Sequence, residues 1–151
     1  MIRNIIASIL VAFPVLAYAQ AGWVEMRPGT FFNKPASGEV FLAASLNAQD
    51  EVQHMFIGFE GFYCYPGETK VVGYVGDFRV NDQPLHFELS CMNGHEIYIP
   101  QSDRGKAFLS GEVEKADRVH LDLGAGRQFN YDVFGYETIE ETIKQTNADA
   151  M

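Results

Sequence analysis

The sequence predicts a mainly β protein, an antiparallel β-sandwich or small β-barrel with one short C-terminal α-helix. Three observations lead to this fold class. Apolar and polar residues alternate over several segments, as they do in strands that bury one face. Turn residues recur about every 8 to 20 residues, a spacing typical of antiparallel folds. Only the last segment of the chain repeats its apolar residues at clear helical spacing.

The first segment has the three parts of an export signal. Arg3 gives a positive start, an apolar core follows over residues 5–16, and Ala17-Tyr18-Ala19 supplies small residues at a cleavage site. The apolar run is shorter than the roughly 20 residues of a bilayer-spanning helix. We therefore expect residues 1–19 to be a cleaved signal peptide and Gln20 to begin a periplasmic or secreted protein. No later stretch is apolar enough to predict a membrane span.

Loss of this segment leaves one β-rich domain, expected over residues 20–147, with a frayed tail at 148–151. The chain has 11 Lys and Arg against 20 Asp and Glu, so loss of Arg3 changes the formal net charge from −9 to −10. Nucleic acids require a basic footprint, and this composition argues against them and against anionic membranes. Acidity suits a cationic protein partner, although solubility alone also explains it.

Five alternating segments predict strands with one buried apolar face. Their inward residues are Val40, Leu42, Ala44 and Leu46; Val72, Tyr74, Phe78 and Val80; Leu85, Phe87, Leu89 and Cys91; Val119, Leu121 and Leu123; and Phe129, Tyr131 and Val133. The stretch 55–63 is apolar on both faces and predicts a central strand covered twice. Residues 23–26 predict an edge strand, and the rest of 20–37 receives no assignment.

Small and polar residues mark the turns between these strands. Asn93-Gly94 is the strongest hairpin signal, because both residues accept positive φ. Further turns are expected at residues 66–67, 81–84, 103–105 and 124–126.

The predicted helix covers about residues 138–147. Thr138 and Glu141 match the S/T-x-x-E capping box. The helix is expected to pack an apolar stripe on the sheet and to carry an i,i+4 ion pair on another face. The stripe consists of Tyr136, Ile139 and Ile143, and the pair of Glu140 and Lys144.

The two cysteines, Cys64 and Cys91, predict a disulfide. Export would place this even number of thiols in an oxidising compartment. Free thiols, a redox pair and metal ligands are the alternatives. The chain has no C-x-x-C motif and no histidine at zinc-ligand spacing from either cysteine, so a structural disulfide is favoured.

Two strands carry histidine and a carboxylate on their polar faces. His86 with Glu88 and His120 with Asp122 would converge on a metal ion if the strands were neighbours. Solvated faces of amphipathic strands explain the same residues without a metal, and no cofactor is implied. No nucleophile elbow, phosphate loop or distinct carboxylate pair is present, so an enzyme lacks positive support.

Aromatic residues beside turns give the remaining candidate site. Phe31, Phe32 and Tyr65 flank Pro and Gly residues, where burial is less assured, and they form a candidate binding patch. The favoured hypothesis is an exported, non-catalytic binding module with a protein partner, for example an inhibitor, an immunity protein or an envelope accessory protein. A small periplasmic hydrolase or metal-dependent enzyme is one alternative. A structural subunit of a surface or secretion assembly is the other.

Overall fold

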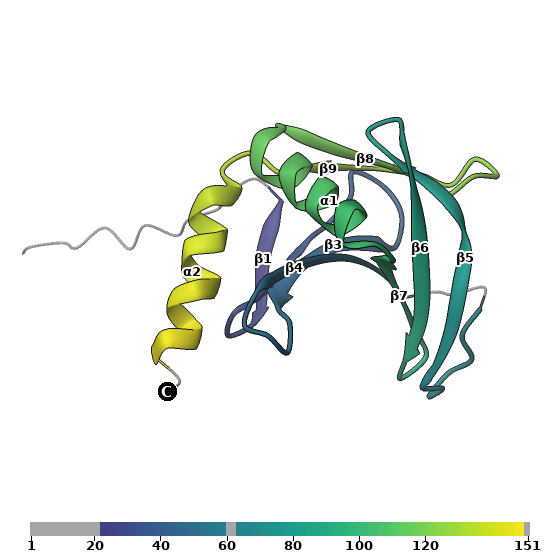
Figure 1. Ribbon diagram of the computed structural model, residues 1–151, viewed down its shortest axis with the longest axis horizontal. Helices are drawn as coiled ribbons and strands as arrows, with labels where there is room; N and C mark the ends of the chain where they lie inside the picture. Colours follow the sequence, from purple (N-terminus) through teal and green to yellow (C-terminus); the bar gives the residue numbers. More distant parts are fainter. Residues whose placement is uncertain (1–21, 60–62, 150–151) are drawn as a thin grey trace, which may run out of the picture.

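A computed structural model describes residues 22–59 and 63–149 (Figure 1). The expected signal peptide, with Ala17, Ala19 and Gln20, lies outside this range, and so do residues 150–151 of the expected tail. The described residues form nine strands and two helices. These are β1 (Trp23–Arg27), β2 (Thr30–Asn33), β3 (Val40–Leu46), β4 (Val52–Gly58), β5 (Lys70–Val80), β6 (Gln83–Met92), β7 (His95–Pro100), α1 (Asp103–Lys115), β8 (Arg118–Asp122), β9 (Gln128–Asp132) and α2 (Tyr136–Asp149).

The strands form one antiparallel sheet in the order β1-β2-β3-β4-β7-β6-β5-β8-β9, which confirms the mainly β fold. The sheet curves strongly, so that β8 and β9 return over β3 and β4 (Figure 1). Residues just after β2 meet β9: the Ala36 N–H donates to the Asn130 carbonyl at 2.9 Å. The side-chain amide of Asn33 also donates to the Asp132 carbonyl. The curl therefore brings the edge strand β9 against the end of β2, next to the opposite edge, without closing a barrel.

Both helices pack against the inner face of this curved sheet. α1 lies across its hollow, and α2 stands beside β1 (Figure 1). Leu109 and Val113 of α1 and Ile139 and Ile143 of α2 are buried in the same core as the inward strand residues. The alternation predicted for β3, β6, β8 and β9 is confirmed by these buried faces. The predicted edge strand at residues 23–26 is β1.

β5 departs from its predicted stripe. Val72 and Tyr74 are exposed, and only the end of the strand, at Val80, is fully buried. The register shifts at Gly73 and Gly76, which have φ of 97° and 137°. Each bulge adds one residue and turns the following side chains to the other face, so a simple alternation cannot continue through them.

α1 occupies a segment where the sequence predicted only a turn at residues 103–105. Ser102 caps the helix, and its side chain accepts a hydrogen bond from the Gly105 N–H at 3.0 Å. Glycine at position 105 avoids a tight contact, because a Cβ there would lie 3.2 Å from Pro100 Cβ. Two glycines lower the intrinsic helix propensity, and the packing of Leu109 and Val113 overrides it.

α2 begins at Tyr136, two residues before the predicted capping box. Thr138 therefore lies inside the helix, where its carbonyl accepts the Thr142 hydroxyl. The buried stripe of Tyr136, Ile139 and Ile143 is confirmed, as is the pair of Glu140 and Lys144, 2.5 Å apart. The helix starts directly after Gly135, whose φ of 79° is not helical.

Candidate functional site

The outer face of the sheet, turned away from the helices, carries a broad apolar surface. We call it the outer apolar surface; it consists of Val24, Met26, Phe32, Phe41, Ala43, Met55, Ile57, Phe59, Met92, His95 and Ile97. Strand pairing aligns these residues in rows, since directly opposite residues share a face. One row runs Val24, Phe32, Ala43, Met55 and another Phe41, Ile57, Ile97. Much of this surface lines a groove of about 460 Å³.

Aromatic rings fill the centre of the outer apolar surface, and long apolar side chains stand at its rim. The rings of Phe32, Phe41 and Phe59 lie 5.1 to 6.1 Å apart. Met26 and Met92 are 60% and 59% exposed. β4 was predicted to be covered on both faces, but only its inner face, which includes Phe56, is covered by the core.

The imidazole of His95 is a polar group within the outer apolar surface. The His95 ring contacts Phe59 edge-on at 4.8 Å. Its Nδ1 is buried and finds no hydrogen-bond partner among the described residues. A buried polar atom without a partner costs free energy comparable to a lost hydrogen bond.

The three residues of the predicted aromatic patch, Phe31, Phe32 and Tyr65, lie in three different environments and do not form one surface. Phe31 is 7% exposed and belongs to the core, which corrects its assignment to a surface patch. Phe32 points the other way, into the outer apolar surface, because successive strand residues face opposite sides. Tyr65 is 75% exposed in the segment before β5, where its ring lies 5.9 Å from Lys70 Nζ.

The two histidine–carboxylate pairs do not converge. β5 lies between β6, which carries His86 and Glu88, and β8, which carries His120 and Asp122. His86 Nδ1 pairs instead with Asp77 at 2.5 Å. Within residues 22–59 and 63–149, no three His, Cys, Asp or Glu side chains are placed to hold a metal ion.

The predicted disulfide between Cys64 and Cys91 is confirmed, with Cα atoms 5.6 Å apart. Cys91 lies on the buried face of β6, as expected. Cys64 belongs to the segment between β4 and β5 rather than to the end of a strand. The bond therefore fastens this connection to the sheet.

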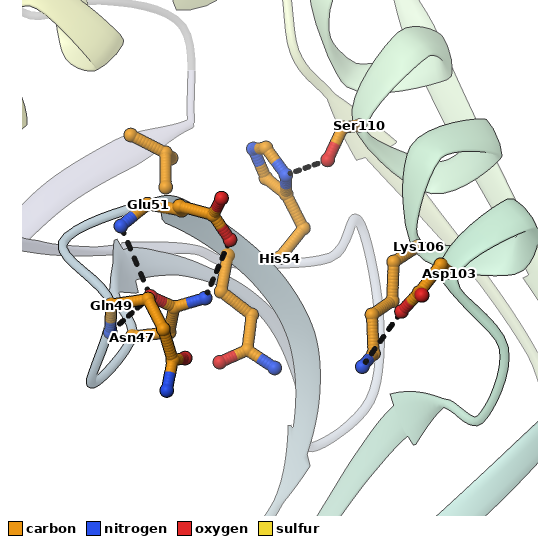
Figure 2. A pocket seen from close by; sticks show the side chains of 9 residues that line it. Asn47, Gln49, Glu51, His54, Asp103, Lys106 and Ser110 are labelled. Atoms are coloured by element: carbon orange, nitrogen blue, oxygen red, sulfur yellow. Dashed lines mark hydrogen bonds and ion pairs between the residues drawn. The ribbon is translucent and has the colours of Figure 1, made fainter.

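A polar pocket of about 240 Å³ lies on the opposite side of β4, beside α1 (Figure 2). It is lined by Asn47, Gln49, Glu51, Val52, Gln53, His54, Asp103, Lys106 and Ser110. His54 is 4% exposed and joins three elements. Its Nδ1 lies 2.8 Å from Ser110 Oγ on α1, and its Nε2 lies 2.7 Å from the Tyr136 hydroxyl on α2.

Hydrogen-bond accounting assigns the direction of these two bonds. Of the two neutral His54 tautomers, only one lets the buried Tyr136 hydroxyl donate to its partner, His54 Nε2, and we assign that one. Nε2 then accepts, so Nδ1 carries the hydrogen and donates to Ser110 Oγ. In this tautomer the imidazole cannot remove the Ser110 proton, which general-base activation of a serine nucleophile requires.

Burial also keeps the network uncharged. Desolvation lowers the pKa of His54 to about 4, although the negative charge of Glu140 opposes the shift. Burial raises the pKa of the Tyr136 hydroxyl well above its usual value, with smaller contributions from Glu140 and Glu114. The uncharged His54 side chain therefore links β4 to α1 and α2 by hydrogen bonds. Its inward position could have been predicted from the sequence, because strand alternation places it on the same face as Phe56.

Comparisons with protein families, with curated proteins and with solved structures find no match to this chain. Neither of the two described helices has the length and apolarity needed to cross a bilayer.

Proposed function

We propose that this chain is an exported, non-catalytic binding module that docks a cationic protein on its outer apolar surface. The observation that carries the proposal is that apolar side chains from six neighbouring strands form this surface, with exposed Val24, Met26 and Met92 at its rim and buried Ala43 and Ile97 at its base. A contiguous apolar patch of this kind is typical of interaction sites in soluble proteins. Its content of Phe and Met is typical of interface centres, where flexible thioethers adapt to a partner and rings supply area.

Charge selects among the occupants of this surface. Two copies of the chain without residues 1–19, each with a formal net charge of −10, repel each other, whereas a cationic protein is attracted at long range. The rings of Phe32, Phe41 and Phe59 can receive the alkyl stems and the charges of Lys or Arg side chains.

Export is the second part of the proposal. It is supported by the pattern of residues 1–19 and by the Cys64–Cys91 disulfide, since disulfides persist in oxidising compartments. Comparison of the precursor mass with the mass of the protein in the periplasm or medium tests it. Mature protein should begin at Gln20, and an exported chain that retained Met1 would contradict cleavage.

Affinity capture with matched variants tests the binding surface. Phe59→Ala removes a ring from its centre, and Phe134→Ala removes a 67% exposed ring that lies outside it. A captured basic protein should bind at least about tenfold more weakly to Phe59→Ala, and less than about twofold more weakly to Phe134→Ala. Binding should also weaken as salt screens the charges.

Three results would contradict this docking mode. They are the capture of no basic protein at any ionic strength, equal binding by both variants, and self-association in place of capture. In the last case, dimers that Phe59→Ala disrupts would assign the outer apolar surface to a second copy and support the structural-subunit alternative.

A further inference from the structure

Tyr136 connects the start of α2 to the rest of the molecule. Its hydroxyl bonds to His54 on β4, and its ring lies 5.3 Å from the ring of Trp23 on β1. The remaining buried anchors of α2 are Ile139 and Ile143. The attachment of this terminal helix therefore depends on few side chains, one of which requires a neutral His54.

The charged and titratable groups around His54 come from every element packed against it. They are Tyr136 and Glu140 of α2; Asp103, Lys106 and Glu114 of α1; and Glu51 of the loop before β4. Ser110 of α1 is the remaining hydrogen-bond partner. Glu140 favours the protonated ring by its charge, but burial outweighs it, so the docked state resists protonation.

Protonation of His54 removes the acceptor that its hydrogen bond with the Tyr136 hydroxyl requires. An imidazolium ion has two N–H donors and no acceptor, so Nε2 can no longer receive the Tyr136 hydroxyl. The phenol then loses its acceptor, and a positive charge is left on a ring that is only 4% exposed to water. Departure of α2 relieves both costs, because it exposes the ring to water and brings no further break in the sheet.

We propose that protonation of His54 releases α2 from the sheet, while the sheet and its Cys64–Cys91 bond remain folded. β4 is held on both sides by β3 and β7, whereas α2 is held by side-chain packing and by the Tyr136–His54 hydrogen bond. Local opening of a terminal element with few anchors precedes global unfolding in many proteins. The chain thus contains an acid-sensitive device that uncovers Trp23 and the inner apolar side chains beneath α2.

The direction of the pH effect follows from the pKa of His54. It is about 4 in the docked state and returns to the ordinary 6.5 when the ring meets water. The released form therefore binds the proton more tightly. Docking is at full strength above pH 6.5 and weakens as the pH falls towards 4. The difference corresponds to a rise of roughly 300-fold in the opening equilibrium constant from well above pH 6.5 to well below pH 4, of which roughly 80-fold falls between pH 6.5 and pH 4.

Trp23 provides the measurement, because it is the single tryptophan of the chain and contacts Tyr136 directly. We expect its emission to shift to longer wavelength between pH 6.5 and pH 4, before the far-ultraviolet signal of the strands is lost. His54→Gln, which retains a side-chain acceptor but does not titrate, should abolish this early shift. His86→Gln, at an exposed histidine of β6, should leave it unchanged.

Hydrogen exchange of the wild-type chain gives a second test that needs no variant. After correction for intrinsic rates, amides of residues 139–149 should lose protection at pH 5 while those of β6 and β7 keep it. The proposal is overturned if α2 and the sheet lose protection together, if α2 stays protected at pH 4, or if a folded His54→Gln retains the shift.

Discussion

Glu96 is a fully buried carboxylate at the second position of β7. It accepts the Tyr63 N–H at 2.6 Å and the Tyr98 hydroxyl. Burial, together with this bond to Glu96, raises the pKa of Tyr98 well above its usual value, so the phenol keeps the proton that it donates. Glu96 thus holds the chain next to Cys64 against the end of the sheet.

Replacement of Glu96 by Gln tests this assignment. The amide supplies one acceptor oxygen but turns an N–H group towards a donor, so we expect a loss of about 2 to 3 kcal/mol in unfolding free energy. Glu88→Gln, at an exposed position of β6, is the control and should change stability by less than about 0.5 kcal/mol. Urea unfolding measures both, and equal values for the two variants would show that Glu96 is not a structural acceptor.

Single residues also show what the sequence could predict about the candidate sites. Alternation fixes which neighbours share a face, but it does not say which face is buried. Phe31 and Phe32 were therefore grouped as one patch, although they lie on opposite sides of β2. The partners of His54 come from α1 and α2, which lie 56 and 82 residues further along the chain. No local pattern contains that contact.

Among the elements, hairpins were predicted best because their signals are local. Asn93 and Gly94 have φ of 52° and 83°, as the two-residue turn between β6 and β7 requires. Asn81 and Asp82 likewise form the turn between β5 and β6. α1 was missed because tertiary packing stabilises it against two glycines, and β5 was misread because bulges interrupt its alternation.

Gly94 and Gly124 both lie in hairpin turns with positive φ, and only Gly94 is closely packed. Alanine substitutions at the two positions therefore separate the cost of backbone strain from the cost of a steric clash. Both have positive φ, so alanine at either costs about 1 to 2 kcal/mol in backbone strain. A Cβ at Gly124 meets no atom within 4 Å, whereas one at Gly94 would lie 2.9 Å from the Gly67 backbone nitrogen. Since backbone cannot easily move aside, Gly94→Ala should lose a further 1 to 3 kcal/mol or so.

Thermal or urea unfolding of the two alanine variants gives the comparison. The difference between them isolates the contact of the β6–β7 hairpin with the segment after Cys64. If Gly124→Ala were as destabilising as Gly94→Ala, the hairpin tip would not be packed against that segment.

At the scale of the whole molecule, the sequence predicted an antiparallel β protein with a C-terminal helix but not the path of the sheet. Alternation reports the number and faces of strands, and hairpin turns report which neighbours pair. The pairings of β4 with β7 and of β5 with β8 join strands distant in sequence, and they determine the curl. That curl separates a helix-covered inner face from the outer apolar surface, so the proposed binding site is a property of the complete sheet.

The Cys64–Cys91 disulfide acts on the whole molecule through its unfolded state. The bond closes a segment with a sequence separation of 27, which in the chain-entropy model stabilises the fold by about 3.5 kcal/mol. The double variant Cys64→Ala and Cys91→Ala should therefore unfold at a lower urea concentration. Its m-value should rise, because an uncrosslinked unfolded chain exposes more surface. An unchanged midpoint with a native circular dichroism spectrum would mean that the strand pairing of β6 already holds this segment in place, and that oxidation adds nothing to the stability of the protein.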